Sequence, residues 1–250
     1  MKKIDFVLVT TTIIILLCNI SSYASDIINV QALNSRIIML HFDDGFVRYH
    51  KRGESRQNEW VVSEPLDVMK AGNVNNYTIK SSNGFYGNQQ KPVKVSRKSK
   101  GTECKWLCQN WSQSVGCINS KPDHAKEHWI YLHLPEPLET GKKYNISTGD
   151  IAGNGKEWEF EFTLEKNRSE AIHVNIIGYD PRAPKKYGYV YHWGGETGGI
   201  DFSNYNGNNF YLINTKSGEK AFTGTVKFRK SKSNIETYQT NDTPNQNFLG

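Results

Sequence analysis

Short runs of alternating apolar and polar residues, typical of β-strands, recur along the chain. Two of them, 27–33 and 36–42, are joined by the polar pair Asn34-Ser35, a connection of hairpin length. Further runs follow at 129–134 and 158–164. Helical periodicity is weak throughout, although 65–71 predicts one or two turns of helix. The pattern therefore predicts an all-β protein.

The first residues have the pattern of an export signal. Lys2 and Lys3 precede an apolar stretch at 6–18, and Ser22-Tyr23-Ala24 supplies the small residues that a signal peptidase reads. The stretch is too short for a transmembrane helix. We expect 1–24 to be a signal peptide and the mature chain to be secreted or periplasmic. The alternative, acylation of Cys18, would associate the chain with a cell surface.

Composition and charge narrow the class of partner. The 250 residues carry a formal charge of +6, which is mild and requires no nucleic acid. Part of that charge lies in one Ser- and Gly-containing segment, which is read either as a solvated loop or as a surface for anionic polysaccharide. Its basic residues are Lys91, Lys94, Arg97, Lys98, Lys100 and Lys105.

One motif stands out near residue 175. The chain places Val174, Asn175, Gly178, Tyr179, Pro181 and Lys186 in an order that resembles the opening of the Ig-like domain preceding the catalytic barrel in family 9 glycoside hydrolases, the cellulase family. Ile176 stands where that family usually has Gln. The residues themselves predict a strand over 171–177 ended by a turn at 178–181. Tyr187, Tyr189 and Tyr191 would then place three rings on one face of the next strand, covering a core.

The region before the motif is similar to bacterial Ig-like domains in the order of its strands and turns over 129–154. The two resemblances imply two Ig-like β-sandwich domains in tandem, at 25–165 and 170–250, with 165–169 as linker. After a strand at 221–228 the sequence becomes polar, so we expect the second domain to be incomplete and a catalytic domain to follow in the same polypeptide.

The resemblance implies a parent enzyme that cleaves β-linked glucans with two carboxylates. The family's catalytic Asp-x-x-Asp setting is absent, and Asp43-Asp44-Gly45 is read as a turn. We therefore expect the 250 residues to be an accessory region with no catalytic residue, metal or cofactor. In the motif near residue 175, we expect a structural role for Asn175, Gly178, Tyr179, Pro181 and Lys186. The alternative is a non-catalytic carbohydrate-binding or cell-surface protein.

An insertion between 100 and 129 carries the remaining chemistry. Cys104, Cys108 and Cys117 predict one disulfide and one free thiol, in a pairing that the spacing leaves open. With His124 and His128 they could instead bind zinc. Trp106 and Trp111 are the candidates for stacking on polysaccharide, and the alternative is that both rings pack beneath the loop.

Overall fold

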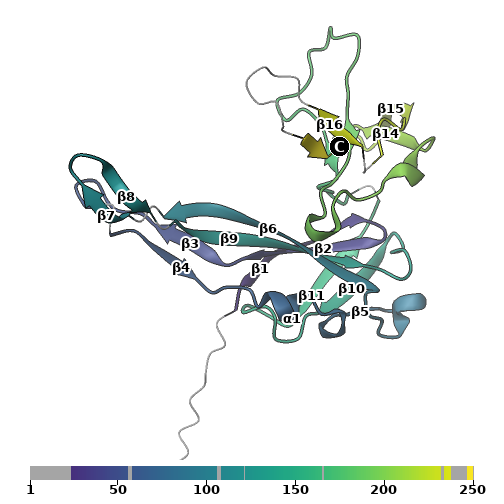
Figure 1. Cartoon of the computed structure of the whole chain (residues 1–250). Coiled ribbons are helices and arrows are strands. Elements are labelled where there is room, and N and C mark those ends of the chain that lie inside the picture. The colour runs from purple at the N-terminus through teal and green to yellow at the C-terminus, as the bar shows by residue number, and fades with distance from the viewer. Residues whose placement is uncertain are drawn as a thin grey trace, which may run out of the picture.

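The chain is all-β and is built from antiparallel sheets (Figure 1). The structure is a computed structural model that describes residues 24–55, 58–105, 108–120, 122–164, 166–231, 234–237 and 247–249. The predicted signal peptide lies outside the described residues, apart from Ala24. None of the helices in the described segments has the length and apolar character needed to cross a membrane.

Two sheets form the main body. The larger sheet has the order β1-β2-β9-β6, with β1 at Asp26–Asn34, β2 at Ile37–Asp43, β9 at Asp123–His133 and β6 at Lys94–Lys105. The smaller sheet has the order β11-β10-β5, with β11 at Glu157–Phe162, β10 at Lys142–Ser147 and β5 at Thr78–Ser81. The predicted hairpin at 27–42 is confirmed, because β1 pairs with β2 across Asn34–Ile37.

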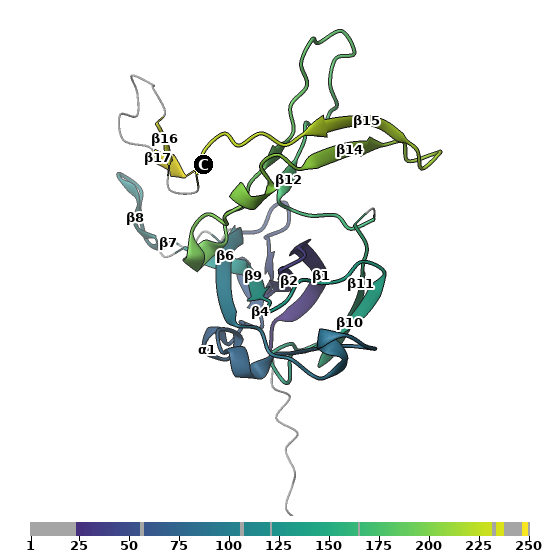
Figure 2. The same cartoon turned by 90° about the vertical axis from the view of Figure 1, so that its right-hand side faces the viewer.

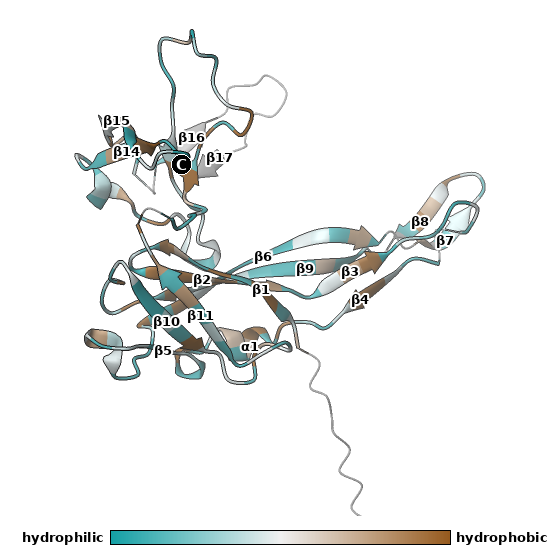
Figure 3. Ribbon diagram, turned by 180° about the vertical axis from the view of Figure 1, so that it is seen from behind, coloured by the Kyte–Doolittle hydropathy of each residue, from teal (hydrophilic) through white to brown (hydrophobic). Residues whose placement is uncertain are grey.

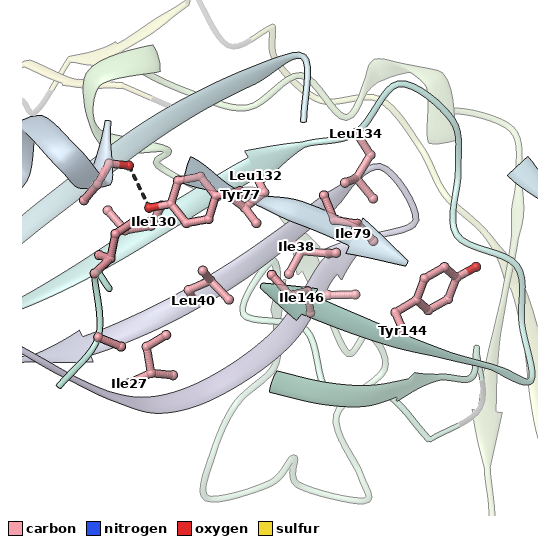
Figure 4. Packing of buried hydrophobic residues seen from close by; sticks show 14 of the residues in the cluster. Ile27, Ile38, Leu40, Tyr77, Ile79, Ile130, Leu132, Leu134, Tyr144 and Ile146 are labelled. Atoms are coloured by element: carbon pink, nitrogen blue, oxygen red, sulfur yellow. Dashed lines mark hydrogen bonds between the residues drawn. The ribbon is translucent and has the colours of Figure 1, made fainter. Parts of the chain in front are cut away.

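A hydrophobic core lies between these two sheets (Figure 4). Ile38 and Leu132 of the larger sheet and Ile79 and Ile146 of the smaller one are completely buried. Tyr77 enters the same core, and its hydroxyl donates a 2.7 Å hydrogen bond to the carbonyl of Ala71, drawn as the dashed line in Figure 4. The apolar alternation read from the sequence therefore corresponds to the inward faces of these strands.

Strands β6 and β9 continue past the core as a long ribbon (Figures 1 and 3). The hairpin of β3 (Gly45–Arg48) and β4 (Trp60–Ser63) runs beside this ribbon, and β7 (Cys108–Ser112) and β8 (Gly116–Ser120) form its tip. The basic segment expected to be a loop is therefore largely strand β6. Its polar residues are tolerated because β6 is the edge strand of the sheet.

One short helix, α1 (Val68–Ala71), follows β4, within the segment for which the sequence predicts one or two turns. The Asp67 carboxylate caps it by accepting from the backbone N–H groups of Met69 and Lys70. Two single 3-10 turns, η2 (Val74–Asn76) and η3 (Phe85–Gly87), lie on either side of β5. These turns and α1 lie at the same end of the body as the smaller sheet (Figure 1).

The C-terminal part lies against the outer face of the larger sheet (Figure 2). Ala171, Ile200 and Phe202 pack there against Met39 and Tyr131. In its described residues the strands form three separate pairs. These are β12 (Ile172–His173) with β13 (Tyr189–Val190), β14 (Asn209–Ile213) with β15 (Lys220–Thr225) and β16 (Ile235–Thr237) with β17 (Asn247–Leu249), with the 3-10 turns η4 (Gly195–Thr197) and η5 (Ser203–Tyr205) between β13 and β14.

The strand expected over 171–177 is much shorter than the sequence predicts. Strand β12 ends at His173, and Ile176 and Ile177 form a turn in which they are 98% and 91% exposed. Tyr187, Tyr189 and Tyr191 are about half exposed, so the expectation that these rings cover a core is wrong for the described residues. Apolar β-branched residues favour a strand only where a partner strand is present to pair with them.

Candidate functional site

The cysteines lie around the tip of the ribbon. Cys108 and Cys117 form a disulfide that joins β7 to β8, with 5.7 Å between their Cα atoms, and Cys104 is exposed and outside any disulfide. His128 of the zinc alternative points instead toward Asp44 and Ser99. Within the described residues, no three His, Cys, Asp or Glu side chains gather closely enough to hold a metal ion.

The two tryptophans proposed for sugar stacking have different outcomes. Trp111 lies on β7 opposite Cys117 and is 68% exposed, so it does not pack beneath the loop. Trp106 lies outside the described residues. Trp111 lines neither of the two cavities described below and is a strongly exposed ring at the tip.

The motif residues near 175 form a local network. The Tyr179 hydroxyl accepts from the backbone N–H of Asn175 at 3.1 Å and donates to the carbonyl of Tyr187. The Lys186 ammonium donates to the carbonyls of Pro181 and Ala183, at 3.2 and 2.9 Å. Gly178 has φ +89°, a conformation that favours glycine. In the structure these residues hold one turn together, and none of them lines either of the two cavities described below.

A cavity of about 470 Å³ opens beside the β3–β4 hairpin. We call it the Trp60 pocket, and its lining combines two aromatic rings with charged and amide side chains. The lining residues are Arg48, Tyr49, Lys51, Glu54, Asn58, Glu59, Trp60 and Lys105.

The aromatic rings of the Trp60 pocket are open to solvent. Trp60 is 44% exposed and Tyr49 is 52% exposed. The Arg48 guanidinium lies 4.8 Å from the centroid of the Trp60 ring, which fixes the indole through a cation–π contact. The Glu59 carboxylate, a buried member of the lining, bonds to His50 Nδ1 at 2.5 Å. The pocket therefore presents exposed aromatic rings, with the Trp60 ring positioned by Arg48, beside side chains that can form hydrogen bonds.

A second cavity, of about 280 Å³, lies where the core ends and the ribbon begins. Among the residues that line it, Asp44 Oδ2 is 2.9 Å from His128 Nε2, and both side chains are only 4% exposed. On the other side of the imidazole, Nδ1 is 2.7 Å from the hydroxyl oxygen of Ser99. Ser99 and His128 face each other in the ladder between β6 and β9, which sets their spacing.

The Asp44 carboxylate is fixed by the fold. Its Oδ1 accepts from the backbone N–H of Leu66 at 3.0 Å. Burial alone raises the pKa of Asp44, but the hydrogen bonds from His128 and the Leu66 N–H outweigh it and hold that pKa below its ordinary value. Asp44 is therefore ionised at neutral pH.

A second chain of contacts reaches Ser99 from the C-terminal part. Glu196 of η4 binds the Arg97 guanidinium at 2.9 Å and accepts from the Arg97 backbone N–H at 3.1 Å. Arg97 Nη1 in turn donates to the Ser99 hydroxyl oxygen at 3.1 Å. Glu196 is thus linked to Ser99 through Arg97.

The sequence predicts neither the Trp60 pocket nor the smaller cavity. Asp43-Asp44-Gly45 is read from the sequence as a turn, and Asp43 does accept from the Gly45 N–H at 2.9 Å. The next residue, Asp44, instead points inward to His128, which is 84 residues away in the chain. Trp60 had no motif around it, and only its place beside Tyr49 and Arg48 marks it as part of a site.

Comparison with known proteins finds no match among family models, curated proteins or solved structures.

Proposed function

We propose that this chain is the Ig-like accessory region of a secreted or periplasmic glycoside hydrolase that acts on β-linked glucans, and that it binds the glycan at the Trp60 pocket. The region would consist of two Ig-like β-sandwich domains in tandem, and the glycosidic bond would be cleaved by a catalytic domain of the same polypeptide. The Trp60 pocket is the observation that carries the binding role.

The chemistry of the Trp60 pocket suits a sugar. The electron-rich face of an indole attracts the weakly positive C–H groups on the face of a pyranose ring. Lys51, Glu54 and Asn58 in the lining offer donors and acceptors for the ring hydroxyls. A cavity of about 470 Å³ falls within the range of ordinary small-molecule sites.

Exposed apolar residues support a neighbouring domain as partner. Ile172, Val174, Ile176 and Ile177 are all at least 60% exposed, and they lie in or beside the motif that resembles the cellulase family. Apolar groups gathered at the surface favour an interface with another protein surface. In the proposed enzyme this partner is the catalytic domain.

An oxidising compartment agrees with the covalent structure. The Cys108–Cys117 bond joins two exposed strands at the tip of the ribbon, and such bonds persist outside the reducing cytosol. This supports export of the chain, as the pattern of the first 24 residues predicts.

A second candidate function is a cell-surface glycan-binding protein without a catalytic domain. The 68% exposure of Trp111 favours it, because a single ring at the tip of a ribbon can reach a surface that the body cannot. The two candidates place the sugar at different tryptophans.

Affinity electrophoresis of the chain 25–250 through gels containing soluble β-glucan separates the two candidates. We expect retardation that Trp60→Ala reduces at least about tenfold in apparent affinity, as for a central aromatic anchor. Trp111→Ala is the matched control and leaves retardation unchanged. Loss with Trp111→Ala alone would move the site to the tip, and migration unaffected by any β-glucan would overturn glycan binding.

A further inference from the structure

The side chains at the smaller cavity form one continuous hydrogen-bonded chain. It runs from Glu196 through Arg97 and Ser99 to His128 and ends at Asp44, with links between 2.7 and 3.1 Å. It joins two carboxylates, a guanidinium, a hydroxyl and an imidazole. Only its Asp44–His128 end is buried, and the core has no need of a buried ion pair there, because apolar residues would fill the site at lower desolvation cost.

The protonation of His128 follows from its neighbours. An ionised carboxylate can only accept hydrogen bonds, so His128 Nε2 carries the proton that faces Asp44. In the neutral ring Nδ1 is then an acceptor, and the Ser99 hydroxyl donates to it. Asp44 thus holds the imidazole in the tautomer that takes a proton from Ser99.

Ser99 is accessible on its other side. It is exposed, and it lines the cavity of about 280 Å³ together with three cationic side chains, Arg97, Lys100 and Lys126. In the described chain no carboxylate pairs with Lys100 or Lys126, whereas Glu196 holds Arg97 in a fixed position. A negative charge that develops next to Ser99 would therefore meet cations already in place.

We infer that Ser99 and His128 are the nucleophile and the general base of a site that hydrolyses small carboxylic esters. The Ser99 oxygen attacks the ester carbonyl as its proton passes to His128 Nδ1, and the Arg97 guanidinium stabilises the resulting oxyanion. The C–O bond to the alcohol then breaks, and His128 returns the proton to the departing alkoxide. Water hydrolyses the acyl-Ser99 intermediate by the same steps and releases the carboxylic acid.

The geometry satisfies the general signature of an activated nucleophile. Nucleophile and base lie within hydrogen-bond reach, and a third group orients the base. Such sites are recognised by geometry and not by order in the sequence, which explains why the absence of a Gly-x-Ser-x-Gly motif does not remove this one. The cavity limits the substrate to a small acyl group, such as acetyl.

This inference stands independently of glycan binding. The Trp60 pocket and the smaller cavity, which Ser99 lines, have no lining residue in common. A failure of either experiment therefore leaves the other proposal untouched.

A nearby pair supplies a matched control. Ser96 and His133 lie on the same two strands, with 3.1 Å between the hydroxyl oxygen and Nε2. Ser96 is buried, and in the described residues no ion pair joins His133 to a carboxylate. This pair reproduces the serine–imidazole contact without the orienting acid or the open cavity.

The test is hydrolysis of p-nitrophenyl acetate by the chain 25–250, with labelling by a fluorophosphonate probe read by peptide mass spectrometry. We expect the probe to attach to Ser99, and Ser99→Ala to lower the enzyme-dependent rate at least about 100-fold. Ser96→Ala should leave both readouts unchanged. Because Ser99 is exposed, its replacement by Ala leaves the fold intact, and a melting curve checks this.

Two results would overturn the inference. One is an unlabelled Ser99 in a folded chain together with a Ser99→Ala rate equal to that of the unsubstituted chain. The other is equal loss of activity in Ser96→Ala and Ser99→Ala, which would show that the hydrolysis depends on neither serine as a specific nucleophile.

Discussion

The Tyr131 hydroxyl and His192 Nε2 lie 2.7 Å apart in a buried contact that joins the larger sheet to the C-terminal part. Burial raises the pKa of Tyr131, so its hydroxyl keeps the proton and donates it in this hydrogen bond. Burial, with the nearby charge of Lys98, lowers the pKa of His192 to about 4, so its ring is neutral and accepts. The two shifts agree on the direction of the bond.

A pH dependence of stability follows from His192. The unfolded chain takes up the His192 proton near pH 6.5, whereas the folded chain resists it until about pH 4. The unfolded state therefore binds more protons in this window, and the free energy of unfolding falls as the pH falls through it. Lys98, Glu170, His173 and Tyr131 are the groups that face the ring.

We expect His192→Gln to remove most of this dependence while retaining an acceptor for Tyr131. When the pH is lowered from about 7 to about 5, the free energy of unfolding measured in urea should fall by up to about 2 kcal/mol more in the unsubstituted chain than in the variant. His133, whose pKa burial and Lys94 also lower, contributes equally to both chains. Parallel curves for the two chains would contradict the role of His192.

The buried Asp44–His128 pair makes Asp44 a sensitive position. Asp44→Ala leaves the His128 ring and the Leu66 N–H without their partner in the interior, and we expect it to cost about 3 to 5 kcal/mol of unfolding free energy. The exposed Asp150, 3.5 Å from Lys70, is the control, and Asp150→Ala should change stability by less than about 1 kcal/mol. Equal urea midpoints for the two variants would contradict the burial of Asp44.

Thiol chemistry checks the arrangement of the ribbon tip. In the chain 25–250, Ellman's reagent should detect one thiol, that of Cys104, before reduction, and three after unfolding with reductant. Replacing Cys108 and Cys117 by Ser opens a short loop, at a cost of about 2 kcal/mol. Three reactive thiols in the oxidised native chain would contradict the disulfide.

Local signals in the sequence predict the local parts of the fold. The β1–β2 hairpin follows from two alternating runs and a short polar turn, which involve only neighbouring residues. Strand β9 begins at Asp123, well before the predicted 129, because its first half pairs within an exposed ribbon and has no apolar run. Strand β6 likewise has no apolar run over its exposed half, so the sequence does not predict it as a strand.

The sites depend on contacts that the sequence does not display. Ser99 and His128 meet only because β6 pairs with β9 in one register, and Asp44 reaches them from the end of β2. Cross-strand register is set by the packing of the whole sheet and not by any one segment. The motif near 175 was recognisable because its Tyr179 and Lys186 contacts are all local.

Binding at the Trp60 pocket is tested most directly by the indole N–H signals of the six tryptophans. These signals are followed by NMR while the chain 25–250 is titrated with a soluble β-linked glucose oligosaccharide, and each is assigned by a single Trp→Phe variant. The proposal predicts a saturable shift of the Trp60 signal, with those of Trp111 and the half-exposed Trp193 unchanged. A Trp60 signal that stays fixed at saturating oligosaccharide would contradict it.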